Sequence, residues 1–204
     1  MGTAAAQLDP WFPELPHVPY ELKKNENGIL LRLTDALDTP RYQWIMSIEQ
    51  TKQIWPELNV KLPPQIWDWT EIHAGIPHIN LATQEKFVPQ MINYELIGGV
   101  NFKKGCYPGQ EIVARTHYLG KQKRRMVLAQ IPSITVRSGM EVFTSDDLSQ
   151  PCGMIVNAQP NDTISSDCLI EIKTTYLTGT TVQLASGEVC HWQVMPYALP
   201  ADVS

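Results

Sequence analysis

The residue best suited to chemistry in this 204-residue chain is Cys106, which stands in a glycine-punctuated turn. Lys103 and Lys104 precede it, and Pro108-Gly109 follows it as a turn signal. Residues 110–119 contain no Gly or Pro and space their apolar side chains along one face, which predicts a helix. A thiol between lysines and a helix N-terminus is stabilised as the nucleophilic thiolate. The pattern predicts a reactive thiol, although a buried, inert cysteine also fits these residues.

The segment from Lys103 to Arg125 is basic within an acidic chain. It holds seven Lys and Arg residues against one acid, Glu111, while the formal net charge of the chain is -5. Arg115 follows Glu111 by four residues, in the order that favours an ion pair on a helix. The overall charge argues against non-specific binding to nucleic acid, and we expect no DNA partner. The basic segment is either a solvated surface or an RNA contact.

Length and composition indicate a globular protein, because 43% of the residues are hydrophobic and the chain can bury a core. No apolar run of about 18 residues occurs, so we expect neither a membrane span nor a membrane partner. The N-terminus lacks the basic and apolar regions of a signal peptide, which predicts a cytoplasmic protein. Cys152, Cys168 and Cys190 are predicted to be packing residues. Their spacing does not support a structural zinc site.

The elements ahead of Cys106 are predicted to mix strands and helices. Residues 28–33 and 42–48 are β-branched and aromatic, which indicates two antiparallel strands. Ser47 and Gln50 form a capping-box pattern ahead of a predicted helix at 49–58. A second helix is predicted at 65–74, after two prolines and before a glycine.

After Arg125 the sequence changes to short apolar or β-branched runs separated by turn residues, which predicts a small antiparallel β-barrel. The six predicted strands are 126–131, 140–143, 153–157, 168–173, 181–184 and 189–194. The chain is therefore assigned to the α+β class. Its predicted parts are an irregular, proline-rich lead-in at 1–27, an α+β domain at 28–122 and the barrel at 123–204.

The run from Lys104 to Arg115 reads K-G-C-Y-P-G-Q-E-I-V-A-R. It resembles the signature K-G-C-[FY]-x-G-Q-E-x-x-x-R of the YgfZ family of folate-binding proteins, with every fixed position present. That family is related to the T-protein, the aminomethyltransferase of the glycine cleavage system. The resemblance covers roughly residues 28–200. It implies part of a T-protein-like folate-binding domain followed by a β-barrel, in a chain that is truncated at its N-terminus.

The resemblance implies a folate-binding accessory protein that assists iron–sulfur enzymes, including those that thiolate tRNA. Cys106 would be the functional thiol and Lys104 its electrostatic partner, while tetrahydrofolate would be the cofactor. Folate contacts are implied for Trp67, His73, Tyr107 and Arg115. His73 stands where relatives carry a glutamate, and a neutral imidazole accepts only one of the hydrogen bonds that a carboxylate accepts from a pterin.

Two other functions remain open at this point. One is a tetrahydrofolate-dependent one-carbon transferase like the T-protein. The catalytic aspartate of the T-protein belongs to a region that has no counterpart here, so this chain alone is predicted to be inactive in that reaction. The other is a module that binds tRNA weakly through residues 103–125, with an affinity that falls steeply as salt rises.

Overall fold

The computed structural model describes residues 6–58, 62–107, 109–119, 122–161 and 164–200. The chain divides into two compact units, Met1–Trp67 and Asp68–Ser204. Both units combine helices with antiparallel strands, in agreement with the predicted α+β class. The predicted boundary near residue 122 falls inside the second unit, and the domain assignment stays a prediction.

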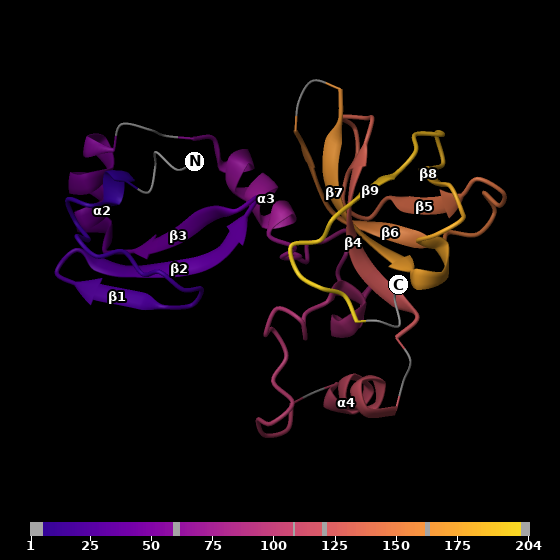
Figure 1. The fold of residues 1–204 in the computed structure, drawn as a ribbon, viewed down its shortest axis with the longest axis horizontal. Coiled ribbons are helices and arrows are strands. Elements are labelled where there is room, and N and C mark those ends of the chain that lie inside the picture. The colour runs from indigo at the N-terminus through magenta and orange to yellow at the C-terminus, as the bar shows by residue number, and fades with distance from the viewer. Residues whose placement is uncertain (1–5, 59–61, 108, 120–121, 162–163, 201–204) are drawn as a thin grey trace. The chain divides into compact units, whose positions relative to one another are not determined.

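The first unit is built on a three-stranded antiparallel sheet (Figure 1). Its strands, in sheet order, are β1 (Leu22–Asn25), β2 (Gly28–Ala36) and β3 (Thr39–Ile45). Trp44 of β3 packs against Trp11 and Phe12, with ring centroids 5.5 and 5.4 Å away. Phe12 is almost fully buried, so the lead-in is anchored rather than irregular throughout. It also contains a short 3-10 helix, η1 (Ala6–Leu8).

Helix α2 (Ile48–Ile54) follows β3 and continues as the 3-10 turn η2 (Trp55–Glu57). The predicted capping box is present: Gln50 N donates to Ser47 Oγ at 3.2 Å, and Ser47 N donates to Gln50 Oε1 at 3.0 Å. These bonds satisfy two backbone groups that the helix itself leaves unpaired.

Helix α3 (Pro64–His73) ends in a Schellman motif. Ile76 N donates to Glu71 O and Gly75 N donates to Ile72 O, both at 3.0 Å. Gly75 has a φ of 67°, in the left-handed region that glycine tolerates best. A Cβ atom there would also lie 2.5 Å from Cε1 of Tyr197, so this position requires glycine on two grounds.

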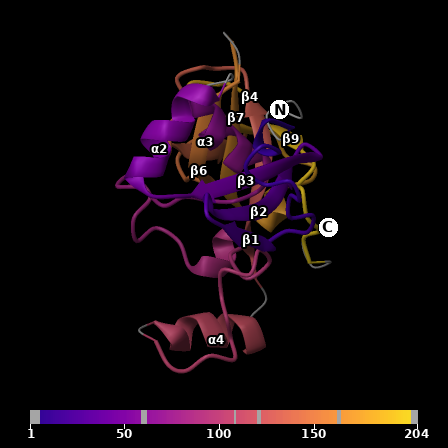
Figure 2. The same ribbon diagram turned by 90° about the vertical axis from the view of Figure 1, so that its left-hand side faces the viewer.

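A curled six-stranded antiparallel sheet forms most of the second unit, as the two views in Figures 1 and 2 show. All six predicted strands are present, and the sheet order is β8-β5-β6-β7-β4-β9. The inward side chains of this sheet form an apolar core that includes Val142, Ile155 and Ile170. The strand bounds are β4 (Arg124–Ile131), β5 (Glu141–Thr144), β6 (Gly153–Pro160), β7 (Ser166–Lys173), β8 (Val182–Leu184) and β9 (His191–Gln193).

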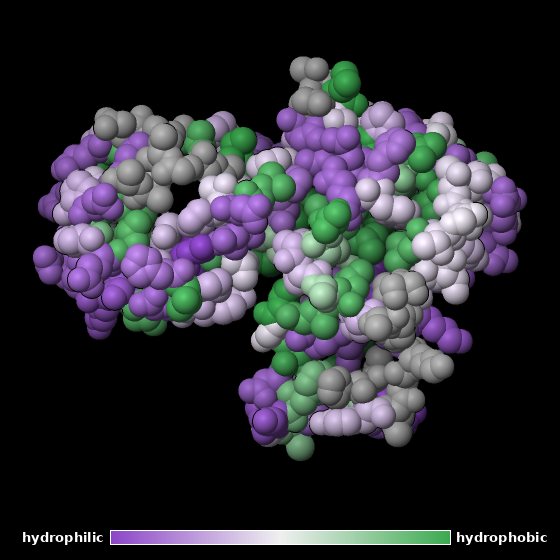
Figure 3. Space-filling model, viewed as in Figure 1, coloured by the Kyte–Doolittle hydropathy of each residue, from purple (hydrophilic) through white to green (hydrophobic). Residues whose placement is uncertain are grey.

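The remaining elements of the second unit are η3 (Pro89–Ile92), α4 (Gln110–Leu119) and η4 (Thr174–Tyr176). Helix α4 has the predicted bounds and lies away from the strands in both ribbon views. Hydrophobic residues gather on the second unit around the C-terminal segment (Figure 3). In the described ranges of the chain, no helix is both long and apolar enough to cross a membrane.

Candidate functional site around Cys106

The four cysteines, all of which lie in the described ranges, differ sharply in exposure. Cys106 is exposed, whereas Cys152, Cys168 and Cys190 are buried in the core of the six-stranded sheet. Burial raises the pKa of the Cys190 thiol to about 12, and it also raises the pKa values of Cys152 and Cys168. The three buried thiols are therefore protonated and inert near neutral pH. The alternative of a buried Cys106 is excluded.

Two local contacts shape the turn that carries Cys106. Asn101 Oδ1 accepts hydrogen bonds from Lys103 N at 2.9 Å and from Lys104 N at 3.2 Å. The ammonium of Lys104 lies 4.8 Å from the ring centroid of Tyr107, a cation–π contact that folds the chain back around Gly105 and Cys106. Cys106 follows Lys104 by two residues, so the lysine and the thiol belong to the same turn.

The start of α4 is fixed to the same turn. Tyr107 N donates to Gln110 Oε1 at 3.3 Å, and Gln110 N donates to Tyr107 O at 3.2 Å. Gly109, with a φ of 81°, supplies the left-handed backbone just before the helix. Arg115 Nη2 lies 2.8 Å from Glu111 Oε1, so the predicted ion pair is present on the exposed surface of α4.

A cavity of about 240 Å³ adjoins the turn. Lys104 and Tyr107 are among its lining residues, together with Gly98 and Gly99. Its volume lies slightly below the range of roughly 300–1,000 Å³ that is typical of small-molecule sites. The cavity can hold part of a ligand next to Cys106. The full lining is Pro89, Tyr94, Gly98, Gly99, Val100, Asn101, Lys104 and Tyr107.

The basic segment contributes less free charge than its sequence suggests. Arg124 pairs with Glu171, with 2.9 Å between Nη2 and Oε2, and the buried Arg125 pairs with Glu95. These two arginines are structural ion pairs of β4 rather than free cations at the surface. Lys123 is exposed, whereas Lys121 lies outside the described residues. Arg124 and Arg125 of the predicted RNA-contact segment 103–125 are thus already paired, and the weak tRNA contact stays a prediction.

His73 and Trp67 lie in different surroundings from the turn. His73 is 6% exposed, and its Nε2 lies 2.8 Å from Asp167 Oδ2. Trp69 Nε1 donates to the same oxygen at 2.8 Å, and the Trp69 and His73 rings are 4.3 Å apart. Burial alone would raise the pKa of Asp167, but the hydrogen bonds from His73 and Trp69 outweigh it and lower that pKa. His73 therefore belongs to a buried hydrogen-bond network with Asp167 and Trp69.

Trp67 belongs to the first unit and is 41% exposed. The guanidinium of Arg41 lies 5.2 Å from its ring centroid. Of the four predicted folate contacts, Tyr107 lines the cavity beside Cys106, while Arg115 pairs with Glu111 on the surface of α4. The structure thus groups Lys104, Cys106 and Tyr107 in one turn, whereas His73 and Arg115 of the same unit pair with Asp167 and Glu111. The predicted site assignments themselves stay predictions.

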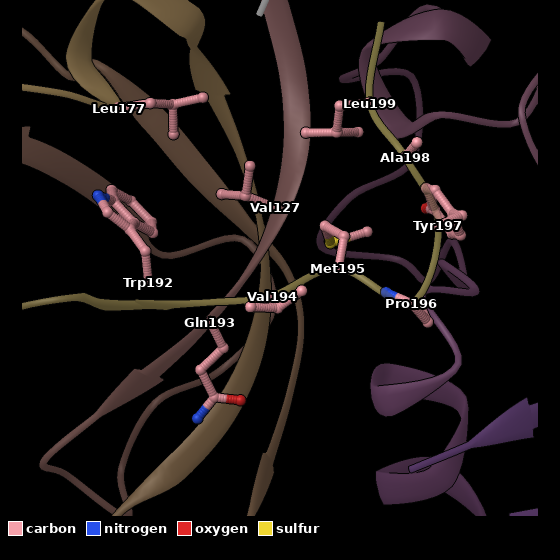
Figure 4. Close-up of a pocket in the computed structure, with 10 residues that line it drawn as sticks. All are labelled: Val127, Leu177, Trp192, Gln193, Val194, Met195, Pro196, Tyr197, Ala198 and Leu199. Atoms are coloured by element: carbon pink, nitrogen blue, oxygen red, sulfur yellow. The ribbon is translucent and has the colours of Figure 1, made fainter. Parts of the chain in front are cut away.

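A larger cavity, of about 500 Å³, lies beside β4 where the C-terminal segment leaves β9. Figure 4 shows Val127 and Met195 near its centre, with Trp192 on one side and Leu199 on the other. Its lining is mostly apolar and contains none of the predicted site residues. Burial raises the pKa of nearby Tyr197 to about 12, so its hydroxyl stays neutral and donates to Gly75 O at 2.9 Å.

Sequence reasoning missed two buried polar residues of the second unit, Asp167 and Gln90. Asp167 stands next to the apolar run at 168–170. An acidic residue that continues a buried strand needs a hydrogen-bond donor or a positive charge elsewhere in the fold, and this signal could have identified it. Gln90 follows a proline in a short apolar stretch, and nothing in the local pattern identifies its partner.

Comparison with known proteins finds curated proteins that are similar to this chain over part of its length. No model of a known protein family matches the chain. The tRNA-modifying protein YgfZ of Photobacterium profundum is 35% identical over 123 residues, which are 57% of this chain and 36% of that protein. The tRNA-modifying protein YgfZ of Yersinia pestis is 34% identical over 127 residues, 61% of this chain and 37% of that protein.

The fold and the site define a mixed α and β protein with one exposed cysteine in a basic turn. Over the matched region, the chain is similar to proteins named tRNA-modifying protein YgfZ. It spans little more than a third of the length of the curated relatives that it matches.

Proposed function

We propose that this chain acts in tRNA modification as an accessory factor for iron–sulfur enzymes that thiolate tRNA, with Cys106 as its reactive thiol. The observation that carries the proposal is the placement of Cys106. It is exposed in a complete YgfZ-type motif, while the other three cysteines are buried. The names of the curated relatives support the tRNA-modification role. The iron–sulfur clients and a weak tRNA contact are part of the proposal.

The chemistry of the turn suits a thiolate. The ammonium of Lys104 lies in the same turn as Cys106, 4.8 Å from the ring centroid of Tyr107. Lysine neighbours are typical of reactive cysteines. The adjoining cavity gives a small ligand or a partner side chain room to approach from the side of Lys104 and Tyr107. A thiolate in this position can act as a nucleophile or as an electron donor toward a partner.

Tetrahydrofolate is proposed as the cofactor, and its fit to the described residues is partial. Trp67 offers an exposed indole face on which a pterin or aminobenzoyl ring can stack. Tyr107 lines a cavity, and the buried His73 already donates a hydrogen bond to Asp167. We therefore assign folate contact first to Trp67 and second to Tyr107. When bound, folate would supply one-carbon carrier chemistry.

Folate binding is tested by titrating tetrahydrofolate into the protein while following tryptophan fluorescence. Trp67→Ala should remove most of the response, and Trp55→Ala, which alters another exposed tryptophan of the first unit, should leave it nearly unchanged. A parent protein without any response would contradict folate binding by this chain.

The thiol role is tested in a bacterial host that lacks its own YgfZ protein. Cys106→Ser should abolish support of tRNA thiolation, because a hydroxyl is a far weaker nucleophile and reductant than a thiolate near neutral pH. Lys123→Gln, which removes an exposed lysine outside the motif, serves as the matched control. Full activity of Cys106→Ser would contradict the proposed function.

A further inference from the structure

The segment that carries Cys106 belongs to the second unit and lies between η3 and β4. We call residues 98–123 the motif arm. Its entry is closed by Gly99 N, which donates to Tyr94 O at 2.7 Å, and its exit leads directly into β4. Within α4, Val113 is buried, whereas Ile112 and Tyr118 are 61% and 69% exposed. Of the hydrophobic residues in the arm whose exposure the structure describes, Val113 alone is buried, so we expect the position of the arm to depend on a small number of specific contacts.

Gln90 makes two of these contacts, one through its side chain and one through its main chain. It belongs to η3 and is only 2% exposed. Its Nε2 donates to Val113 O, in the first turn of α4, at 2.6 Å. Its carbonyl accepts from Arg125 Nη1 at 3.1 Å, where the chain returns from the arm. A single residue thus holds both the helix of the arm and its exit.

The hydrogen bonding of Gln90 is unusual for a buried amide. Its Oε1 has no hydrogen-bond partner in the described part of the chain, so the amide makes one side-chain bond, to Val113 O. Burying an amide is costly unless its groups are paired, and an apolar side chain of similar size would fill the same space without that cost. The hydrogen bond from Gln90 Nε2 to Val113 O is therefore the reason that a glutamine suits this position better than an apolar residue.

A continuous series of contacts connects Gln90 to the turn of Cys106. The amide holds Val113, and α4 begins three residues earlier at Gln110, which exchanges two hydrogen bonds with Tyr107. The ring of Tyr107 in turn holds the ammonium of Lys104. Cys106 lies between Lys104 and Tyr107, so a displacement of the first turn of α4 displaces the groups on both sides of the thiol.

We propose that Gln90 is a positioning residue for Cys106, acting through its hydrogen bond to Val113 O in α4. This inference rests on the proposed function, because positioning the turn matters only if Cys106 is the reactive thiol. It assigns no contact between Gln90 and any substrate. The thiol is the group that reacts, and Gln90 determines how the turn that presents it is held.

The test measures the arm directly in purified full-length protein. Gln90→Met removes the donor and keeps the volume, and Gln90→Asn, which is too short to reach Val113 O, is the second variant if the first does not fold. Hydrogen–deuterium exchange reports the protection of the α4 amides, with the β7 amides as an internal reference. The rate of reaction with 5,5′-dithiobis(2-nitrobenzoate) reports Cys106, because the other three thiols are buried.

Loss of one buried hydrogen bond should lower α4 protection roughly two- to tenfold and change the Cys106 rate and its pH profile, with β7 protection unchanged. Gln43→Met, an exposed glutamine of the first unit, should match the parent in all three readouts. Parent-like α4 protection and Cys106 rates in both Gln90 variants would overturn the inference. A uniform loss of protection in α4 and β7 would also overturn it, since that pattern indicates a general packing role.

The outcome is separable from that of the proposed function. Neither readout involves tRNA, so an unaffected arm in the Gln90 variants removes the positioning role and leaves the role of Cys106 standing. Conversely, full tRNA thiolation with Cys106→Ser would contradict the proposed function. If the Gln90 variants still loosened the arm, Gln90 would remain the residue that positions the turn.

Discussion

The ammonium of Lys104 lies 4.8 Å from the ring centroid of Tyr107, and Cys106 occupies the turn between these two residues. The contact holds a positive charge close to an exposed thiol on the otherwise acidic chain. It also links the thiol to the cavity that both flanking side chains line. The predictions below follow from this arrangement and from the buried contacts that support it.

Replacing Lys104 by Gln should slow the reaction of Cys106 with an anionic disulfide reagent by roughly threefold to fivefold, because it removes a positive charge that attracts the reagent, and such an attraction is worth at most about 1 kcal/mol in water. The effect should shrink as salt screens the charge. Stopped-flow absorbance at low and high ionic strength measures both. Lys123→Gln is the control, and equal rates for the two variants would show that Lys104 has no special relation to the thiol.

Asp167 should make stability depend on pH. Its folded-state pKa is lowered, so it stabilises the fold above the ordinary aspartate pKa of about 4, and this contribution is lost as pH falls through the lower folded-state value. Asp167→Asn should cost about 1–3 kcal/mol at neutral pH, because the donors of His73 and Trp69 lose a charged acceptor.

Urea unfolding at pH 7 and at pH 3–4 measures this effect. Stability of the parent should fall more steeply over that interval than stability of Asp167→Asn. Asp146→Asn, an exposed aspartate in a loop of the same unit, is the control and should follow the parent. A parent and an Asp167→Asn variant with equal pH dependence would contradict the assigned role of the buried carboxylate.

Gly75→Ala should destabilise the protein by about 2 kcal/mol or more, because it combines a left-handed backbone with a steric clash against Tyr197. Gly187 offers a matched control. It also has a positive φ, of 103°, but nothing lies within 4 Å of an added Cβ. Gly187→Ala should therefore cost clearly less. Equal shifts of the two urea midpoints would show that contact with Tyr197 contributes nothing.

Two arginines of the basic segment should behave as structural residues. Arg125→Gln leaves the buried Glu95 unpaired, and removal of one partner from a buried ion pair typically costs about 3–5 kcal/mol. Arg115→Gln breaks an exposed pair and should cost at most about 0.5 kcal/mol. The unfolding temperatures of the two variants, measured by calorimetry, distinguish the buried ion pair from the exposed one. A stable Arg125→Gln variant would return this arginine to the set of candidate RNA contacts.

The sequence predicted regular elements well where a local pattern defines them. Helix α4 has the predicted bounds, the capping box of Ser47 and Gln50 is present, and all six C-terminal strands occur. Strand β1 was missed because its sequence, L-K-K-N, has a single apolar residue. That strand forms by pairing with β2, where Leu22 opposes Leu31, and such a partner is invisible in a local window.

The candidate site was predictable in part for the same reason. Cys106, Lys104 and Tyr107 are neighbours in sequence, so their motif alone indicates that they act together. His73 and Asp167 are 94 residues apart, and Gln90 and Val113 are 23 apart. Their pairing depends on how the second unit folds, and no spacing rule anticipates it. The pairing of Arg124 with Glu171 and of Arg125 with Glu95 was equally hidden, because both acids are remote in sequence.

The most direct test of the central claim is the content of thiolated nucleosides in tRNA, measured by mass spectrometry in a host that depends on this chain. Cys106→Ser should reduce that content to the level of the host without the chain, while Lys123→Gln should match the parent. Native alkylation should label the parent once, at Cys106, and should leave Cys106→Ser unlabelled. Parent levels of tRNA thiolation with the folded Cys106→Ser variant would contradict the account.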